Sequence, residues 1–484
     1  MISVSAILSF TLLLLACLGR ALGQHSTPAL RCCVGVGGLA GFGLWSLAIT
    51  QPDAADAFWL NDSLSRAVML TVSTTAVVLA LLNSSPVTLS HFCWSAGLCG
   101  LAASSSHPLL LWAAFQFSIL AILFFGRTAG DSVPLWKRHS TSLIGSGLFT
   151  VGLLLLLLTH PASPPSVVGT ILLIGGMGGA LGWFPFPRTH LHEDMKDPVD
   201  AAFGQRILPA FTAGVVIWRL THSLALSDQQ SFLFVMAALF SLAMSSLRLF
   251  DESRLSRRLV LTAFATLSYL IVAAFLQNWE QGHPAQGWSA STNLPGPATL
   301  FTSILLCESL VLLLLTTGLR CLNHDRTGAD AVDVLAGGAR RQPFASVPII
   351  LGLASLSGMP PLPGFWWRCG LVMTCLLPHR QSSLTMINER DNSMSLLAAA
   401  LLLLMILNCL GNLRMLERVL FEHPFRLRPQ ARKWSTIVAT GIVLIGFTGV
   451  MCYPFSVDHA FYPVTSVPTP PAEPEPTAPP SPEM

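Results

Sequence analysis

The feature that most constrains this chain is a long succession of apolar stretches interrupted by only a few charges. Hydrophobic residues make up 52% of the 484 positions and charged residues 11%, and the mean hydropathy is +0.62. A soluble domain carries roughly a quarter charged residues, so this chain cannot solvate its own surface in water. Because backbone groups inside a bilayer must be satisfied within their own segment, apolar stretches of about 17–25 residues predict transmembrane helices.

We therefore expect an all-α integral membrane protein of about 14 transmembrane helices. Residues 1–24 resemble a signal peptide, but no basic residue precedes their apolar run, so we expect a retained first helix. The predicted spans are 4–18, 33–50, 67–82, 89–104, 109–126, 142–158, 167–186, 201–220, 231–247, 259–277, 299–318, 347–377, 395–413 and 435–453.

The distribution of basic residues predicts the orientation of these spans. If successive loops alternate between the two sides, one side holds 21 of the 27 basic residues and the other holds 4; the remaining 2, Arg206 and Arg368, fall inside spans. Such a bias follows the positive-inside rule. The basic loops are therefore expected to face the cytoplasm or matrix, and both termini the periplasm or intermembrane space.

Cysteine spacing gives no reason to expect a metal or redox site. The chain has 11 cysteines, none in a paired C-x-x-C arrangement, and most lie in apolar runs where cysteine packs as a small hydrophobe. No G-x-G-x-x-G loop after a strand and no haem motif occurs. We expect no cofactor and no metal in this chain, and nothing indicates a nucleic-acid partner.

Residues 456–484 form a proline-rich tail on the predicted outer side. Proline at this density forbids helix and favours an extended polyproline conformation, with too little apolar area to pack by itself. Two interpretations stay open, a disordered tail and a tail held by a partner subunit.

The span 347–377 contains residues that cannot continue a helix. Gly358, Pro360, Pro361 and Gly364 lie near its middle, and proline removes a backbone donor and clashes with the preceding turn. A broken helix at membrane depth is tolerated where protein or a polar cavity satisfies the freed carbonyls. Arg368, one turn later, is then expected inside the protein beside a half-helix end; the alternative is a proline kink with a snorkelling arginine.

Three blocks of sequence carry a family resemblance. Residues 333–343 read DVLAGGARRQP, residues 355–368 read SLSGMPPLPGFWWR, and residues 412–414 read NLR. In order and spacing they resemble subunit N (mitochondrial subunit 2) of the proton-pumping NADH:quinone oxidoreductase, complex I, whose pattern is S-L-x-G-[IM]-P-P-L-x-G-F-x-x-K. Weaker similarities extend the resemblance over roughly residues 107–421.

The resemblance implies an antiporter-like fold of inverted repeats, each with one broken helix, and a relay of buried ionisable groups that moves protons. It implies this division: helices one to four in 1–105, the first antiporter-like helices in 106–225, the second in 226–425, and a last helix in 426–455. It also implies FMN, iron–sulfur clusters and ubiquinone in partner subunits, other membrane-arm subunits as partners, and bound phospholipid or cardiolipin.

Residue by residue, the relay in this chain is depleted. The family's glutamate falls on Gln116, and two of its lysines fall on Ala180 and Ala210. The last lysine falls on Arg368, which does not deprotonate in proteins. Arg206, one turn before Ala210, is the basic residue nearest to these positions.

Glu308 is the candidate compensation, because it lies in the middle of an apolar span. A membrane-buried charge is costly and marks a functional hypothesis. We expect Glu308 to face the bundle interior and to pair with Arg368 or Arg206; a relay role and a structural ion pair stay equally open. His91 is expected to be a structural histidine.

Three functions remain possible from the sequence. The main one is a complex I membrane-arm subunit that contributes to proton translocation or couples it structurally. A standalone cation/proton antiporter shares the fold but should keep the lost relay residues, and a purely architectural subunit of a respiratory supercomplex suits their loss. The excess of arginine over lysine suits a nuclear gene for an imported mitochondrial protein or a bacterial gene. The unusual tail and the substituted relay positions favour a mitochondrial inner-membrane location, with both termini toward the intermembrane space.

Overall fold

The computed structural model describes most of the chain, with gaps between its helices. The described residues are 4–22, 27–50, 54–55, 59–82, 84–125, 135–158, 166–185, 202–224, 226–282, 296–322, 335–376, 389–422 and 434–452. The tail at 456–484 lies outside them, as do Asp333 and most of the predicted basic loops.

These residues form helices almost throughout. A two-stranded antiparallel ribbon, β1 (Ala54–Ala55) and β2 (Leu60–Asn61), precedes the third helix, with Ala54 opposite Asn61. The helices are α1 (Val4–Leu22), α2 (Thr27–Thr50), α3 (Ser63–Leu81), α4 (Pro86–Ser104), α5 (Pro108–Phe125), α6 (Leu135–Leu158), α7 (Val167–Leu181), the π-helical turn η2 (Phe203–Ile207), α9 (Leu208–Ser223), α10 (Asp228–Asp251), α11 (Leu255–Gly282), α12 (Pro297–Leu322), α13 (Gly338–Arg341), α14 (Pro343–Leu356), α15 (Pro363–Leu376), α16 (Glu389–Phe421) and α17 (Trp434–Cys452).

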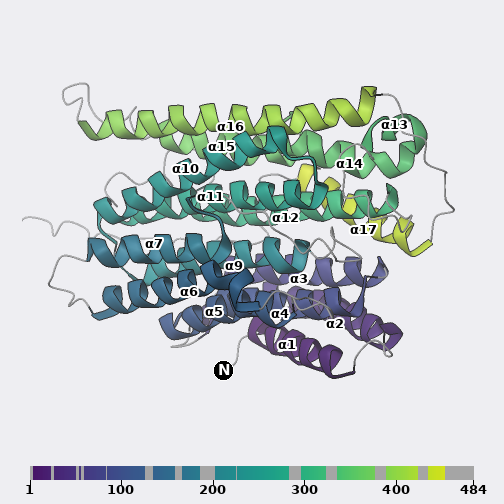
Figure 1. The fold of residues 1–484 in the computed structure, drawn as a ribbon, viewed down its shortest axis with the longest axis horizontal. Helices are drawn as coiled ribbons and strands as arrows, with labels where there is room; N and C mark the ends of the chain where they lie inside the picture. The colour runs from purple at the N-terminus through teal and green to yellow at the C-terminus, as the bar shows by residue number, and fades with distance from the viewer. Residues whose placement is uncertain are drawn as a thin grey trace, which may run out of the picture.

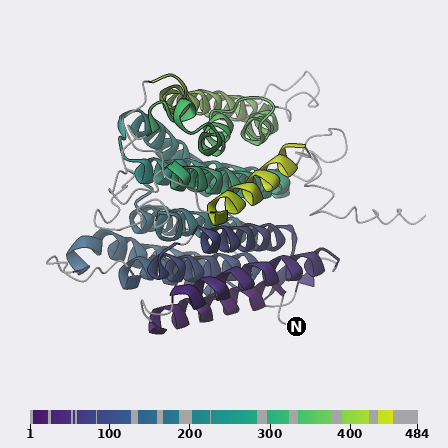
Figure 2. The same cartoon turned by 90° about the vertical axis from the view of Figure 1, so that its right-hand side faces the viewer.

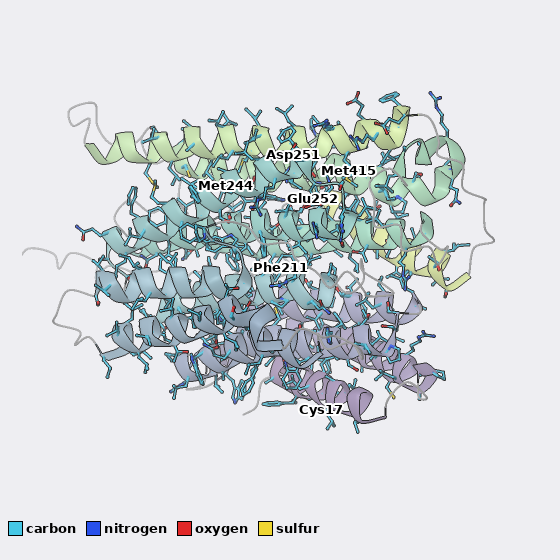
Figure 3. The ribbon with its side chains drawn as sticks, in the orientation of Figure 1. Cys17, Phe211, Met244, Asp251, Glu252 and Met415 are labelled. Carbon is cyan, nitrogen blue, oxygen red and sulfur yellow. The ribbon has the colours of Figure 1, made fainter. Side chains whose placement is uncertain are left out.

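The helices lie roughly side by side, with α1 and α16 at opposite ends of the stack (Figure 1). α11 and α12 lie in the middle of the stack, and α17 returns obliquely to pack against α12 and α3 (Figure 2). Side chains fill the space between layers, as fully buried Phe211 of α9 does near the centre (Figure 3). Among the seven long apolar helices of the described residues, α11 is the most buried.

The prediction of an all-α membrane protein is confirmed. Each predicted span overlaps one helix or, for 201–220 and 347–377, two helical segments, and within the described residues seven helices are long and apolar enough to cross a bilayer by themselves. The number of crossings, and the division of the chain at residues 105, 225 and 425, stay predictions.

The predicted interruption of the span 347–377 is also confirmed, because α14 ends at Leu356 and α15 begins at Pro363. Another prediction was wrong in detail. Arg66 and Arg219, two of the 4 basic residues counted above on the outer side, lie within α3 and α9 and are buried. α9 runs to Ser223, three residues past its predicted end.

Candidate functional site

The break between α14 and α15 is built by glycine and proline. Gly358 adopts a left-handed conformation with φ of 64°, which side-chain-bearing residues rarely tolerate. Gly364 lies so close to the Ser355 carbonyl that a Cβ there would overlap it. Pro363 opens α15 at a position where its missing N–H costs nothing. The chain therefore stops one half-helix and starts the next within a few residues.

The buried side chain of Arg368 provides hydrogen-bond donors at this break. Its guanidinium donates hydrogen bonds to the carbonyl oxygens of Leu356 and Ser355, the latter at 3.3 Å. These carbonyls belong to the end of α14, where helical partners are lacking. The guanidinium also lies 4.8 Å from the centre of the Trp367 ring, a distance typical of a cation–π contact.

The counter-charge of Arg368 is Glu308 of α12. Nη2 of Arg368 lies 3.5 Å from Oε1 of Glu308, and the side chains are only 6% and 2% exposed. Of the two expected partners for Glu308, the structure places Arg368 beside it. Removing either charge from such a pair leaves the other buried and uncompensated, which is strongly destabilising.

Four polar atoms around this ion pair have no hydrogen-bond partner within the described residues. They are Oε2 of Glu308, Nε of Arg368, the hydroxyl of Tyr269 and the indole nitrogen of Trp367. The Tyr269 and Trp367 rings meet edge to face, with 5.0 Å between centroids. Buried polar atoms usually have a partner, so their concentration from α11, α12 and α15 marks this location as the candidate site.

The end of α7 has similar geometry, and we call it the first break and the interruption between α14 and α15 the second break. α7 ends at Leu181, Gly182 is left-handed with φ of 72°, and Arg206 of η2 donates to the Leu181 carbonyl at 3.1 Å. The indole of Trp183 donates to Ser268 at 3.1 Å, and Ser241 donates to the Trp183 carbonyl at 2.7 Å. At both helix ends an arginine thus donates to the carbonyl of the last helical residue.

Gln116, which stands at the position of the family's glutamate, makes hydrogen bonds that join α5 and α6. Gln116 of α5 donates to the Ser146 carbonyl at 3.0 Å and to Thr150 Oγ1 at 2.9 Å, both in α6. The Ser146 hydroxyl donates back to the Gln116 amide oxygen. Ala180 and Ala210 are fully buried. None of these three positions offers a group that titrates.

Replacing Gln116 by glutamate should weaken the α5–α6 contact. A carboxylate cannot donate to the Ser146 carbonyl, so two acceptors would face each other at a buried position. Leaving such a group unsatisfied costs about 1–3 kcal/mol, which we expect as a lower thermal midpoint in detergent. Gln116→Met, which removes the polar group at similar volume, should cost less than Gln116→Glu; equal losses would contradict the hydrogen-bonding role.

An ion pair that the sequence did not reveal, Arg219–Asp62, joins α9 to the start of α3 and to α4; we call it the Arg219–Asp62 clamp. Arg219 of α9 makes two contacts with the Asp62 carboxylate, of 2.6 and 2.8 Å. Its Nε also donates to the Ala103 carbonyl of α4 at 3.1 Å. Asp62 is the N-cap of α3 and forms a capping box with Ser65. The sequence signal that could have located Asp62 is the capping pattern Asp62–Ser65, which is typical of the first residues of a helix.

This clamp should make stability fall in acid. Burial opposes ionisation of Asp62, but the Arg219 charge and the hydrogen bonds from Arg219 and Ser65 hold the pKa of this carboxyl below its ordinary value. Its stabilising contribution is therefore complete above about pH 4 and is lost as the pH falls further, through the lowered pKa. The thermal midpoint should fall more steeply there for the wild type than for Asp62→Asn; parallel curves would contradict the clamp.

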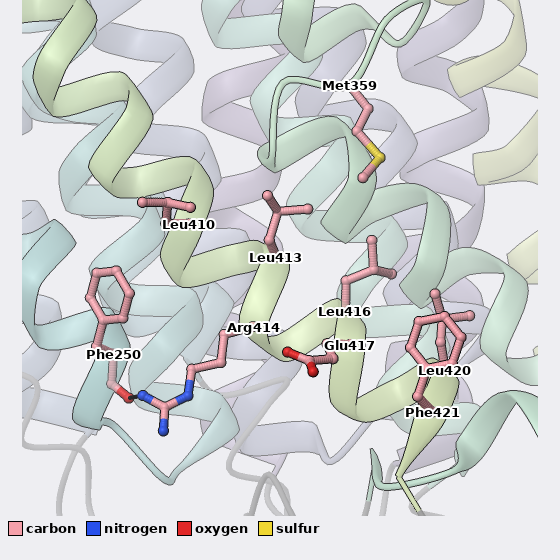
Figure 4. Close-up of a pocket in the computed structure, with 9 residues that line it drawn as sticks. All are labelled: Phe250, Met359, Leu410, Leu413, Arg414, Leu416, Glu417, Leu420 and Phe421. Atoms are coloured by element: carbon pink, nitrogen blue, oxygen red, sulfur yellow. Dashed lines mark hydrogen bonds between the residues drawn. The ribbon is translucent and has the colours of Figure 1, made fainter.

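A groove of about 490 Å³ opens on the outer face of α16 (Figure 4). It runs from Met359 in the break to Phe421 at the end of α16, and Phe250 of α10 forms its other wall. The lining is apolar except for Arg414 and Glu417. Arg414 points across the groove and donates to the Phe250 carbonyl at 3.5 Å.

Sequence comparison finds distant relatives. No protein-family profile matches the chain. It is 24% identical over 287 residues to NAD(P)H-quinone oxidoreductase subunit 2 of Gloeobacter violaceus, which covers 55% of this chain and 53% of that protein. It is 24% identical over 223 residues to NADH-quinone oxidoreductase subunit N of Moorella thermoacetica, covering 45% and 43%. The matches thus span about half the length of these relatives.

Structural comparison covers nearly the whole chain. A chain of respiratory complex I from Thermus thermophilus superposes with a TM-score of 0.62 at 16% identity, covering 94% of this chain and 99% of that one. A chain of the membrane-bound sulfane sulfur reductase, described as an archaeal respiratory membrane complex, gives 0.66 at 13% identity, covering 95% of each. At such identities the likeness establishes the shared fold.

Proposed function

We propose that this chain, a divergent relative of NADH-quinone oxidoreductase subunit N, is a membrane-arm subunit of a respiratory complex that couples quinone reduction to proton translocation. The observation that carries this proposal is the broken helix α14–α15 with the ion pair Arg368–Glu308 sealed inside it. Helix breaks with buried charges at membrane depth are characteristic of ion-translocating proteins. The redox chemistry belongs to partner subunits that carry FMN, iron–sulfur clusters and ubiquinone.

The role of this chain within such a complex is structural coupling rather than a complete proton path of its own. Gln116, Ala180 and Ala210 cannot exchange protons at the positions where the family titrates. Arg368 and Arg206 keep a fixed charge and hold half-helix carbonyls. Glu308 is the one acidic side chain at the site, and it is paired with Arg368.

The proposed setting follows from the same resemblance. The partners are other membrane-arm subunits, including antiporter-like ones, and membrane lipids. The proline-rich tail and the substituted relay positions support a mitochondrial inner membrane, with both termini toward the intermembrane space; the named relatives are bacterial. We place the tail at 456–484 against a partner subunit. The groove on α16 is the proposed place for a phospholipid acyl chain, with Arg414 near the headgroup.

Native electrophoresis of mildly solubilised membranes tests the assignment. The chain should migrate with NADH dehydrogenase activity, detected by an activity stain, and a parallel haem stain identifies supercomplexes. Migration apart from that activity would favour the standalone antiporter and overturn the proposal. Migration only with haem-containing assemblies would favour the architectural subunit.

Measuring protons translocated per electron tests the structural-coupling role. Glu308→Gln keeps the shape of the side chain and removes its charge. If the chain couples neighbours without its own path, the ratio should stay at the wild-type value in complexes that assemble. A reproducible fall in the ratio at unchanged electron flux would show that Glu308 carries protons.

A further inference from the structure

Two successive residues of α11 contact the two helix breaks. Ser268 accepts the hydrogen bond from the Trp183 indole, 3.1 Å away, just past the end of α7. Tyr269 meets the Trp367 ring of α15 edge to face, with 5.0 Å between centroids. All four side chains are buried. One helix therefore touches both interruptions, which lie far apart in the sequence.

The geometry of a helix explains how neighbours in sequence reach different elements. Successive residues project about 100° apart around the axis, so Ser268 and Tyr269 face different helices. α11 lies in the middle of the stack (Figure 1) and packs against α9, η2, α12 and α15. From Leu255 to Gln281 it contains neither glycine nor proline, the usual causes of kinks. This stretch of α11 lacks the residues at which a helix usually bends.

Each of the two tryptophans lies close to a helix end whose last carbonyl accepts from an arginine. Trp183 follows Leu181 by two residues, and the Leu181 carbonyl accepts from Arg206. Trp367 precedes Arg368 directly, and its ring lies under the guanidinium. We therefore expect a shift of either tryptophan to disturb the arginine contact at the same break.

We infer that Ser268 and Tyr269 are positioning residues that join the two helix breaks through α11, so that a displacement at one break is transmitted to the other. This inference concerns contacts within the chain and does not depend on the proposed function. A packed core responds to such a displacement by adopting another discrete arrangement rather than by deforming gradually.

Cys409 of α16 provides a natural reporter at the second break. Its sulfur lies 3.9 Å from Nη1 of Arg368, and it is partly exposed. The full-length chain in its native membranes is treated with a membrane-permeant maleimide, and mass spectrometry measures the rate of alkylation of the Cys409 peptide. Ser268→Ala, a change at the first break, should alter this rate at the second break at least about threefold.

Ser241→Ala is the matched control. It also removes one hydroxyl hydrogen bond to Trp183, but from α10 rather than from α11. The inference requires that Ser241→Ala leave the Cys409 rate near the wild-type value, and that Ser268→Thr, which keeps the hydroxyl, restore it. Equal effects of Ser241→Ala and Ser268→Ala, or no effect of either, would overturn the inference.

A double-mutant cycle checks that Tyr269 carries the connection. Tyr269→Leu removes the ring that contacts Trp367. If Ser268 acts on the second break through Tyr269, adding Ser268→Ala to Tyr269→Leu should not change the Cys409 alkylation rate any further. If Ser268 and Tyr269 act independently, their effects on this rate should multiply. Multiplying effects would show that Ser268 reaches the second break by another route and would overturn the role of Tyr269.

Discussion

Arg368→Leu should destabilise the protein by about 3–5 kcal/mol, the cost of leaving one partner of a buried ion pair alone. Glu308 is 2% exposed and has Arg368 as its only salt-bridge partner within the described residues. The substitution also removes the donors to the carbonyls of Ser355 and Leu356, which end α14 inside the bundle. We expect a large fall in the thermal midpoint of the solubilised protein and less folded chain in membranes.

The double variant Arg368→Leu/Glu308→Leu distinguishes the cost of the unpaired Glu308 charge from the cost of the α14 carbonyls left without donors. Replacing a buried ion pair by apolar residues of similar size is often neutral or stabilising, so the double variant should recover most of the loss. A residual deficit of about 1–3 kcal/mol should remain for the half-helix carbonyls left without donors. If the double variant is as unstable as Arg368→Leu, the uncompensated charge is not the cause and the interpretation of the pair is wrong.

Much of the fold could be predicted because the membrane imposes a simple rule on the sequence. Apolar length located the helices, and the Gly358, Pro360 and Pro361 cluster located the break, since glycine and proline act locally. Helix ends were less predictable because they depend on tertiary partners. Arg219 of α9 pairs with Asp62 across the bundle, and no local pattern in α9 indicates that pairing.

The candidate site was only partly predictable. That Glu308 needs a buried partner follows from the cost of an isolated charge in a membrane, but the sequence offered Arg206 and Arg368 equally. Geometry distinguishes them, because Arg206 instead donates to the Leu181 carbonyl. In the same way, Gln116 was predicted not to titrate, yet its contacts with Ser146 and Thr150 depend on how α5 and α6 pack.

The contact between α6 and α7 leads to the second large prediction. A Cβ added to Gly176 of α7 would overlap the backbone of Phe149 in α6, and one added to Gly145 or Gly152 of α6 would overlap the backbone of α7. Small residues let helix backbones approach in a membrane, where association depends on close packing rather than on hydrophobic exclusion. α6 and α7 pack mainly against each other, so this seam holds the hairpin together.

Gly176→Ala should therefore destabilise the hairpin by about 1–3 kcal/mol through overpacking, and Gly176→Leu should prevent the close approach altogether. The matched control is its neighbour Gly175, where an added Cβ meets no atom within 4 Å. Gly175→Ala should be neutral or stabilising by up to about 1 kcal/mol, because alanine favours helix over glycine. Thermal midpoints and yields of folded protein measure both. If Gly175→Ala and Gly176→Ala lose stability equally, helix flexibility rather than the α6–α7 backbone contact explains the glycines.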